Sequence, residues 1–115
     1  MRRGNHQKFG RETAQRKALY KSLATALIDN GKIKTTEAKA KALVRVVEPM
    51  ITLAKRQNLN ARRELAKDLG VKAVKKLMTD LARQFADRKG GYTRIIRLGQ
   101  RKSDGAEMAI VEFTA

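Results

Sequence analysis

The apolar residues of this 115-residue chain recur mostly three and four positions apart, which is the spacing of one face of an amphipathic helix. The first such pattern predicts a helix over residues 13–30. Gly31 follows it and can adopt the left-handed conformation that ends many helices. The predicted buried stripe of this helix consists of Ala14, Ala18, Leu19, Leu23, Ala26 and Leu27.

The clearest helical pattern covers residues 37–55, and Thr35 or Thr36 can cap this second helix at its start. Its predicted core face carries Leu43, Val46, Val47, Met50, Ile51 and Ala54. Pro49 lies inside the pattern and lacks an amide hydrogen. We therefore expect a kink or a break between Arg45 and Pro49, so that the segment could count as two helices.

Two shorter helices are predicted next. Asn58 or Asn60 can cap a helix that runs to about Leu69 and is ended by Gly70. Another amphipathic helix follows before a loop at residues 87–91. Its apolar face carries Val74, Leu77, Met78, Leu81 and Phe85.

Strand signals occur between the first two predicted helices and again after the last one. Residues 32–35 alternate and are β-branched, and residues 92–98 and 107–113 flank a polar turn as in a hairpin. The pattern predicts an α+β fold, a two-layer domain of three to four helices packed on a small sheet made of one short early strand plus a C-terminal hairpin. We expect a single domain over residues 13–115, preceded by a flexible basic N-terminal arm over residues 1–12.

Charge points to a polyanionic partner. The chain carries 27 Lys and Arg against 11 Asp and Glu, a net charge of +16, which exceeds what solubility requires. Residues 1–60 hold 14 basic and 4 acidic side chains, whereas residues 61–115 hold 13 and 7. The first half is therefore favoured as the main contact surface for nucleic acid.

Several classes of protein are disfavoured. There is no cysteine, which excludes disulfides and thiolate chemistry and suits the cytoplasm. No apolar run approaches the roughly 18 residues that span a bilayer. His6 is the only histidine, so we expect no metal site, and the sequence contains no phosphate-binding loop, nucleophile elbow or zinc-protease motif. We expect no enzyme, no cofactor and no small-molecule substrate.

Cations that could bind RNA phosphates gather in the arm with the next helix, at the start of the second helix, in the loop before the hairpin and in the hairpin turn, and the early strand adds Lys32 and Lys34. Tyr92, directly after the loop that precedes the hairpin, could stack on an unpaired base, although packing on the sheet is somewhat favoured for this residue. The predicted RNA contacts are Arg2, Arg3, His6, Lys8, Arg11, Arg16, Lys17, Lys21, Lys32, Lys34, Lys39, Lys41, Arg88, Lys89, Gly90, Gly91, Tyr92, Arg94, Arg101 and Lys102.

Each of these segments also has a plainer interpretation. The arm could be a solvated tail, and Lys39, Lys41 and Arg45 could simply cover a helix surface. The Ser103–Gly105 turn needs no function to explain it. A DNA-binding architectural protein is the main alternative, and a nuclease that uses scattered carboxylates such as Asp80 and Asp87 is a weaker one.

The order of the motifs resembles a known family. The chain contains Lys-Ile-Lys-Thr-Thr at 32–36, Lys-Ala-Lys at 39–41, Ile-Thr-Leu-Ala-Lys at 51–55 and Gly-Gly-Tyr-Thr-Arg-Ile at 90–95. These blocks resemble the bacterial large-subunit ribosomal protein family numbered seventeen, although this chain has Arg3 where the family commonly has histidine. The resemblance implies a structural role in the large subunit, binding to its ribosomal RNA near the nascent-chain tunnel exit, and neighbouring ribosomal proteins as partners.

Overall fold

The computed structural model describes the backbone of residues 10–114 and the side chains from Thr13 onward. The helical and strand elements follow the predicted order. They are α2 (Gly10–Asn30), β1 (Lys32–Thr36), α3 (Glu37–Ala54), α4 (Leu59–Asp68), α5 (Val71–Lys76), the π-helical η1 (Leu77–Leu81), α6 (Ala82–Gln84), β2 (Thr93–Gln100) and β3 (Glu107–Phe113). The last three helical elements form one continuous run, so the described part has four helices, within the predicted number.

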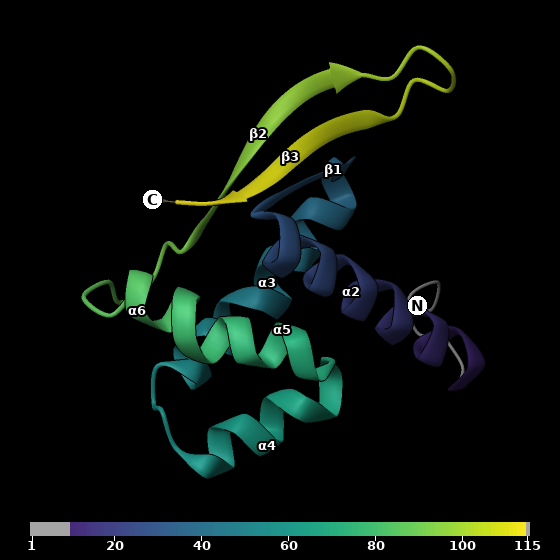
Figure 1. Cartoon of the computed structure of the whole chain (residues 1–115). Helices are drawn as coiled ribbons and strands as arrows, with labels where there is room; N and C mark the ends of the chain where they lie inside the picture. The colour runs from purple at the N-terminus through teal and green to yellow at the C-terminus, as the bar shows by residue number, and fades with distance from the viewer. Residues whose placement is uncertain (1–9, 115) are drawn as a thin grey trace.

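The early strand and the C-terminal hairpin form one three-stranded antiparallel sheet with the order β1-β3-β2. Ile33 lies opposite Val111, and Val111 lies opposite Ile95. Because side chains alternate across a strand, these three share the face that packs against the core. The helices lie on one side of the sheet, and the hairpin extends beyond them (Figure 1). The predicted α+β fold is confirmed.

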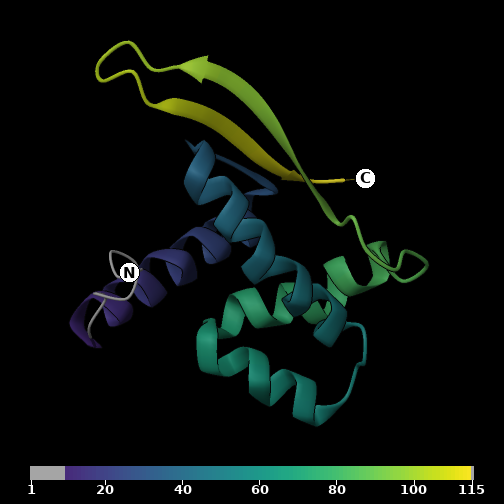
Figure 2. The same cartoon turned by 180° about the vertical axis from the view of Figure 1, so that it is seen from behind.

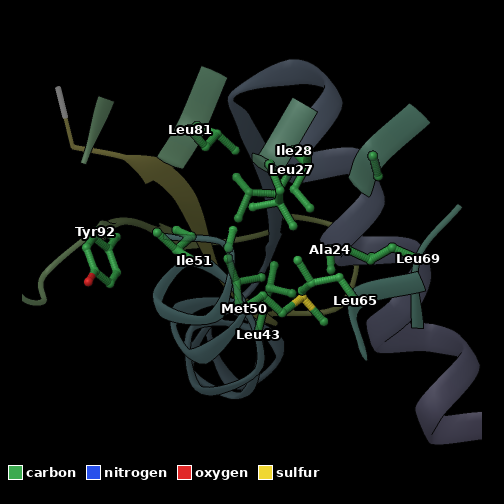
Figure 3. Close-up of a cluster of buried hydrophobic side chains, with 14 of the residues drawn as sticks. Ala24, Leu27, Ile28, Leu43, Met50, Ile51, Leu65, Leu69, Leu81 and Tyr92 are labelled. Carbon is green, nitrogen blue, oxygen red and sulfur yellow. The ribbon is translucent and has the colours of Figure 1, made fainter. Parts of the chain in front are cut away.

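The core lies between α3 and the elements around it. Figure 3 shows one cluster that contains Leu27 and Ile28 of α2, Leu43 and Ile51 of α3, and Leu65 of α4. All five side chains are almost completely buried. Burying apolar surface of this kind provides the main driving force for folding, so α3 is the element on which the others are assembled.

The predicted stripe of α2 is wrong in its first half. Ala14, Ala18 and Leu19 are exposed, whereas in the second half Leu27 is buried and Leu23 and Ala26 are half-buried. Ala24 and Ile28, which the predicted stripe did not include, are also buried. The reason is geometric, since the first half of α2 projects past the other helices (Figure 2). The helix also begins at Gly10, so it includes the last residues of the predicted arm.

Two helix starts agree with the sequence. Thr36 caps α3 by accepting a hydrogen bond from the Lys39 backbone N–H at 3.3 Å, and Asn58 caps α4 by accepting one from the Ala61 N–H at 2.8 Å. Of the kink or break predicted between Arg45 and Pro49, the break is wrong, because the helix runs unbroken through Pro49. The proline is exposed, so its ring meets solvent rather than the packed face of the helix.

Candidate nucleic-acid interface

The ring of Tyr92 is not accessible to an RNA base. Its side chain is only 1% exposed, and its ring meets Phe85 edge-on with the ring centres 5.2 Å apart. The Lys55 ammonium donates a hydrogen bond to the Tyr92 hydroxyl at 3.1 Å, and the Thr52 hydroxyl lies 3.4 Å from it. The ring is therefore packed, as the interpretation favoured for this residue had it, and it is not accessible for the alternative role of stacking on a base. It anchors the loop instead.

The hydrogen bonds to Thr52 and Lys55 lower the pKa of the Tyr92 hydroxyl, and the positive charge of Lys55 acts in the same direction. Lys55 also donates to the Arg88 carbonyl oxygen. The sequence pattern did not predict this anchor. The signal was the spacing of Glu48, Thr52 and Lys55, which are four and three residues apart and so share one face of α3.

Arg88 stabilises the glycine loop, residues 87–91, through hydrogen bonds. Its guanidinium donates to the Thr114 hydroxyl at 2.7 Å and to the Gly91 carbonyl at 3.2 Å, while the Thr114 hydroxyl donates to the same carbonyl at 2.9 Å. Gly91 has φ +63, a conformation that favours glycine. Lys89 and Gly90 are exposed at the loop tip, so Lys89 is the loop cation placed to meet an external phosphate.

A second set of predicted cations lies on the sheet face opposite the helices. Lys32 pairs in register with Glu112, and Glu112 pairs with Arg94, whose Nε lies 2.6 Å from the Glu112 carboxylate. Lys34 is two residues along from Lys32 and shares its face. Lys32, Lys34 and Arg94 are all exposed. The sheet thus brings Lys32 and Lys34 together with Arg94, which is 60 positions after Lys34 in the chain, and Glu112 neutralises part of the charge.

The start of α3 differs from the expectation. Lys39 and Lys41 are exposed, as a phosphate contact requires. Glu37, however, occupies the first turn, where its carboxylate lies 2.9 Å from the Arg97 Nε and 3.7 Å from the Lys41 Nζ. A carboxylate is therefore already present at the helix terminus that we expected to attract a phosphate.

The hairpin turn carries one paired cation and one exposed cation. Arg101 donates two hydrogen bonds to Asp104, from Nε at 3.0 Å and from Nη2 at 2.8 Å. This pair, with a further bond from the Ala106 N–H, lowers the pKa of Asp104 to about 2, and the pKa of Arg101 is raised. Lys102 is exposed beside the pair, so the turn presents Lys102 more openly than Arg101.

Three of the four predicted cations of α2, Arg16, Lys17 and Lys21, line one groove of about 620 Å³ with Lys67 of α4. Four of the predicted arm contacts, Arg2, Arg3, His6 and Lys8, lie outside the described residues. So does the side chain of Arg11. Further exposed cations that the sequence analysis did not single out cover α4 and α5; they are Arg62, Arg63, Lys72 and Lys75.

Two further kinds of feature are absent from the described part of the chain. No helix within residues 10–114 has the length and apolar character needed to cross a bilayer. Among the same residues, histidine and acidic side chains do not gather in groups of three or more that could hold a metal ion.

Comparison with known proteins gives a consistent result. The family described as ribosomal protein L17 matches residues 19–114 of this chain. A protein named large ribosomal subunit protein bL17 from Shouchella clausii is 52% identical over 115 residues, covering 92% of this chain and 96% of the relative. Proteins of the same name from Symbiobacterium thermophilum and Clostridioides difficile are 54% and 51% identical over 109 residues each, covering 94% of this chain and 96% of each relative. With these matches along most of its length, the chain belongs to the ribosomal protein L17 family.

Proposed function

We propose that this chain is a structural constituent of the large ribosomal subunit that binds and stabilises large-subunit ribosomal RNA. The observation that carries the proposal is the gathering of Lys32, Lys34 and Arg94 on the sheet face that the helices leave open. The names of its relatives support the ribosomal setting. Because the family is one of structural components, the chain is not an enzyme.

The binding mechanism follows from charge. Each phosphate that a Lys or Arg neutralises releases condensed counterions, so affinity falls steeply as salt rises. Because the folded sheet fixes the backbone positions of these residues, the spacing of the cations is set before binding, which suits the recognition of RNA shape and backbone. Arg2, Arg3, His6 and Lys8 are proposed as further contacts on their sequence alone.

The proposal also covers the position of the chain on the ribosome and its protein neighbours. We place the chain near the exit of the nascent-chain tunnel on the ribosome of the bacterial cytoplasm, with neighbouring large-subunit proteins as partners. The family resemblance supports this placement. No small-molecule substrate or membrane is part of it.

Sedimentation of a lysate that contains the tagged full chain tests the ribosomal setting, and we expect the chain in the large-subunit fraction. Its absence from that fraction would overturn the proposal. The purified chain should also prefer structured large-subunit RNA over duplex DNA at matched salt, and should leave both uncut when divalent metal is added. A preference for DNA would favour an architectural DNA-binding protein, and metal-dependent cleavage would favour a nuclease.

A paired substitution tests the sheet face directly. If Lys32 and Lys34 each contact a phosphate, then replacing both with glutamine should flatten the slope of log affinity against log salt by about 2. Replacing Lys72 and Lys75, two exposed cations of α5, with glutamine is the matched control and should leave the slope almost unchanged. Equal slopes for the two double variants would remove the sheet face from the interface.

A further inference from the structure

The first half of α2 has no partner within the described part of the chain. Every side chain from Thr13 to Leu19 is exposed, and Leu19 itself is 37% exposed. Figure 2 shows this half of α2 reaching away from α3 and α4. Because helices in proteins draw most of their stability from packing, a projecting helix of this length is suited to being covered by something else.

A groove follows the inner side of this projecting half. It has a volume of about 620 Å³, within the range of roughly 300–1,000 Å³ that is usual for small-molecule sites. Its less exposed lining residues are Tyr20 of α2 with Val46 and Met50 of α3. The floor of the groove is therefore mainly apolar and includes one aromatic ring.

The rim of the groove is positively charged. Arg16, Lys17 and Lys21 line it from α2, and Lys67 lines it from α4. Asp68 is the one acidic residue in the lining. All four cations are exposed. The charge of the rim thus complements an anion, while the floor suits a flat apolar surface.

We infer that this groove receives an unpaired nucleotide of the large-subunit ribosomal RNA, with its base on the Tyr20 side of the floor and its flanking phosphates on the cationic rim. The inference rests on the proposed function and names a specific site within it. Proteins that read RNA sequence do so mostly at loops and bulges, where bases leave the stack and lie on aromatic side chains. Tyr20 is only partly buried and so remains accessible, in contrast to Tyr92.

Two other occupants fit the groove less well. A continuous RNA helix would meet the rim with its phosphates but would leave the apolar floor uncovered, because its bases stay stacked. A segment of a neighbouring protein would have to supply several acidic side chains to match Arg16, Lys17, Lys21 and Lys67. A single extruded nucleotide satisfies both the floor and the rim.

Ultraviolet crosslinking of the full chain to transcribed large-subunit ribosomal RNA tests the site. After digestion with nuclease and trypsin, cleavage at Lys17 and Lys21 releases the peptide 18–21, which contains Tyr20. We expect mass spectrometry to find a nucleotide attached to this peptide. Tyr20→Ala should weaken RNA binding about tenfold, since stacking of one base on an aromatic ring contributes on that order, whereas Tyr20→Phe should bind almost normally.

A pair of tryptophan substitutions provides a control that spares the core. Ala18 lines the groove and Gln15 does not, yet both are exposed on the same half of α2. Ala18→Trp should fill the groove, remove the crosslink on peptide 18–21 and weaken binding, whereas Gln15→Trp should change neither. Circular dichroism of both variants should match that of the unmodified chain.

A negative result can overturn the nucleotide site alone or the proposed function as well, and the experiments distinguish the two. RNA binding that persists with no crosslink on peptide 18–21, or with equal behaviour of Ala18→Trp and Gln15→Trp, would overturn the nucleotide site and leave the proposed function standing. Crosslinking of this peptide to another ribosomal protein within intact subunits would also overturn it. A chain that binds no ribosomal RNA at all would overturn the proposed function together with this inference.

Discussion

Glu48 of α3 accepts two hydrogen bonds from Thr93, the first residue of β2: one from the backbone N–H at 3.1 Å and one from the hydroxyl at 2.9 Å. The two residues are 45 positions apart in the chain. This carboxylate therefore fixes the point where the chain leaves the glycine loop and enters the sheet. It connects the central helix to the strand that carries Arg94.

Removing this carboxylate should destabilise the fold. Glu48→Ala leaves two donors of Thr93 without their partner in a partly buried position, so we expect a loss of about 1–3 kcal/mol in the free energy of unfolding. Glu48→Gln keeps one acceptor oxygen and should lose less. Urea denaturation followed by circular dichroism measures both changes.

Glu64→Ala is the matched control, because Glu64 is exposed and its ion pair with Lys67 at 3.0 Å lies on the surface of α4. Such pairs contribute about 0.2–1 kcal/mol. Equal losses for Glu48→Ala and Glu64→Ala would show that the hydrogen bonds to Thr93 do not stabilise the fold.

The start of α4 gives a second prediction. The Asn58 side chain accepts the hydrogen bond from the Ala61 N–H, whereas Asn60 is exposed inside the helix. Asn58→Ala should therefore lower the free energy of unfolding by about 1 kcal/mol, the usual contribution of such a cap. Asn60→Ala should have almost no destabilising effect in the same urea titration. The reverse order of the two variants would contradict the observed cap.

The caps and strands could be predicted because their causes are local. An Asn before an apolar repeat, or a polar turn between two β-branched segments, determines structure within a few residues. The packing of α2 is different. Ala14 and Ala24 look equally suited to a core, yet only Ala24 is buried. That difference depends on the length of α2 relative to its neighbours, which no local pattern records.

The grouping of the interface cations could likewise be predicted only in part. The charge of Lys32, Lys34 and Arg94 was visible in the sequence, and alternation along a strand was enough to place Lys32 and Lys34 on one face. That Arg94 joins them depends on β1 and β2 both pairing with β3. The burial of Tyr92 depends on Phe85 and Lys55, which come from two other elements. Sequence therefore indicated which cations to consider, and the fold determined how they group.

Pro49 gives a third prediction. Proline costs about 3 kcal/mol relative to alanine inside a helix, because it lacks the N–H that would bond to the carbonyl four residues back, here that of Arg45. The proline is exposed, so its removal should open no cavity. Pro49→Ala should therefore raise the free energy of unfolding by about 1–3 kcal/mol.

Arg45→Ala serves as the control for Pro49→Ala, since it alters an exposed side chain of the same helix without restoring a backbone hydrogen bond. It should change stability by no more than about 0.5 kcal/mol. Thermal and urea unfolding of the two variants give the comparison. A Pro49→Ala variant that is less stable than the unmodified chain would show that α3 depends on the proline for its geometry.

The hairpin turn gives a fourth prediction, which concerns pH. The bonds from Arg101 and the Ala106 N–H stabilise the charged form of Asp104, so its pKa falls from 3.8 to about 2. A carboxyl group with a lowered pKa stabilises the fold above its ordinary pKa, and that contribution is lost as the pH falls through about 2. Nuclear magnetic resonance of the Asp104 carboxyl carbon should show this midpoint.

Arg101→Ala should move the midpoint up toward 3.8, while Lys102→Ala, which removes an adjacent cation with no bond to Asp104, should leave it near 2. A midpoint near 3.8 in the unmodified chain would mean that the pair does not persist in solution and that Arg101 is as available to a phosphate as Lys102.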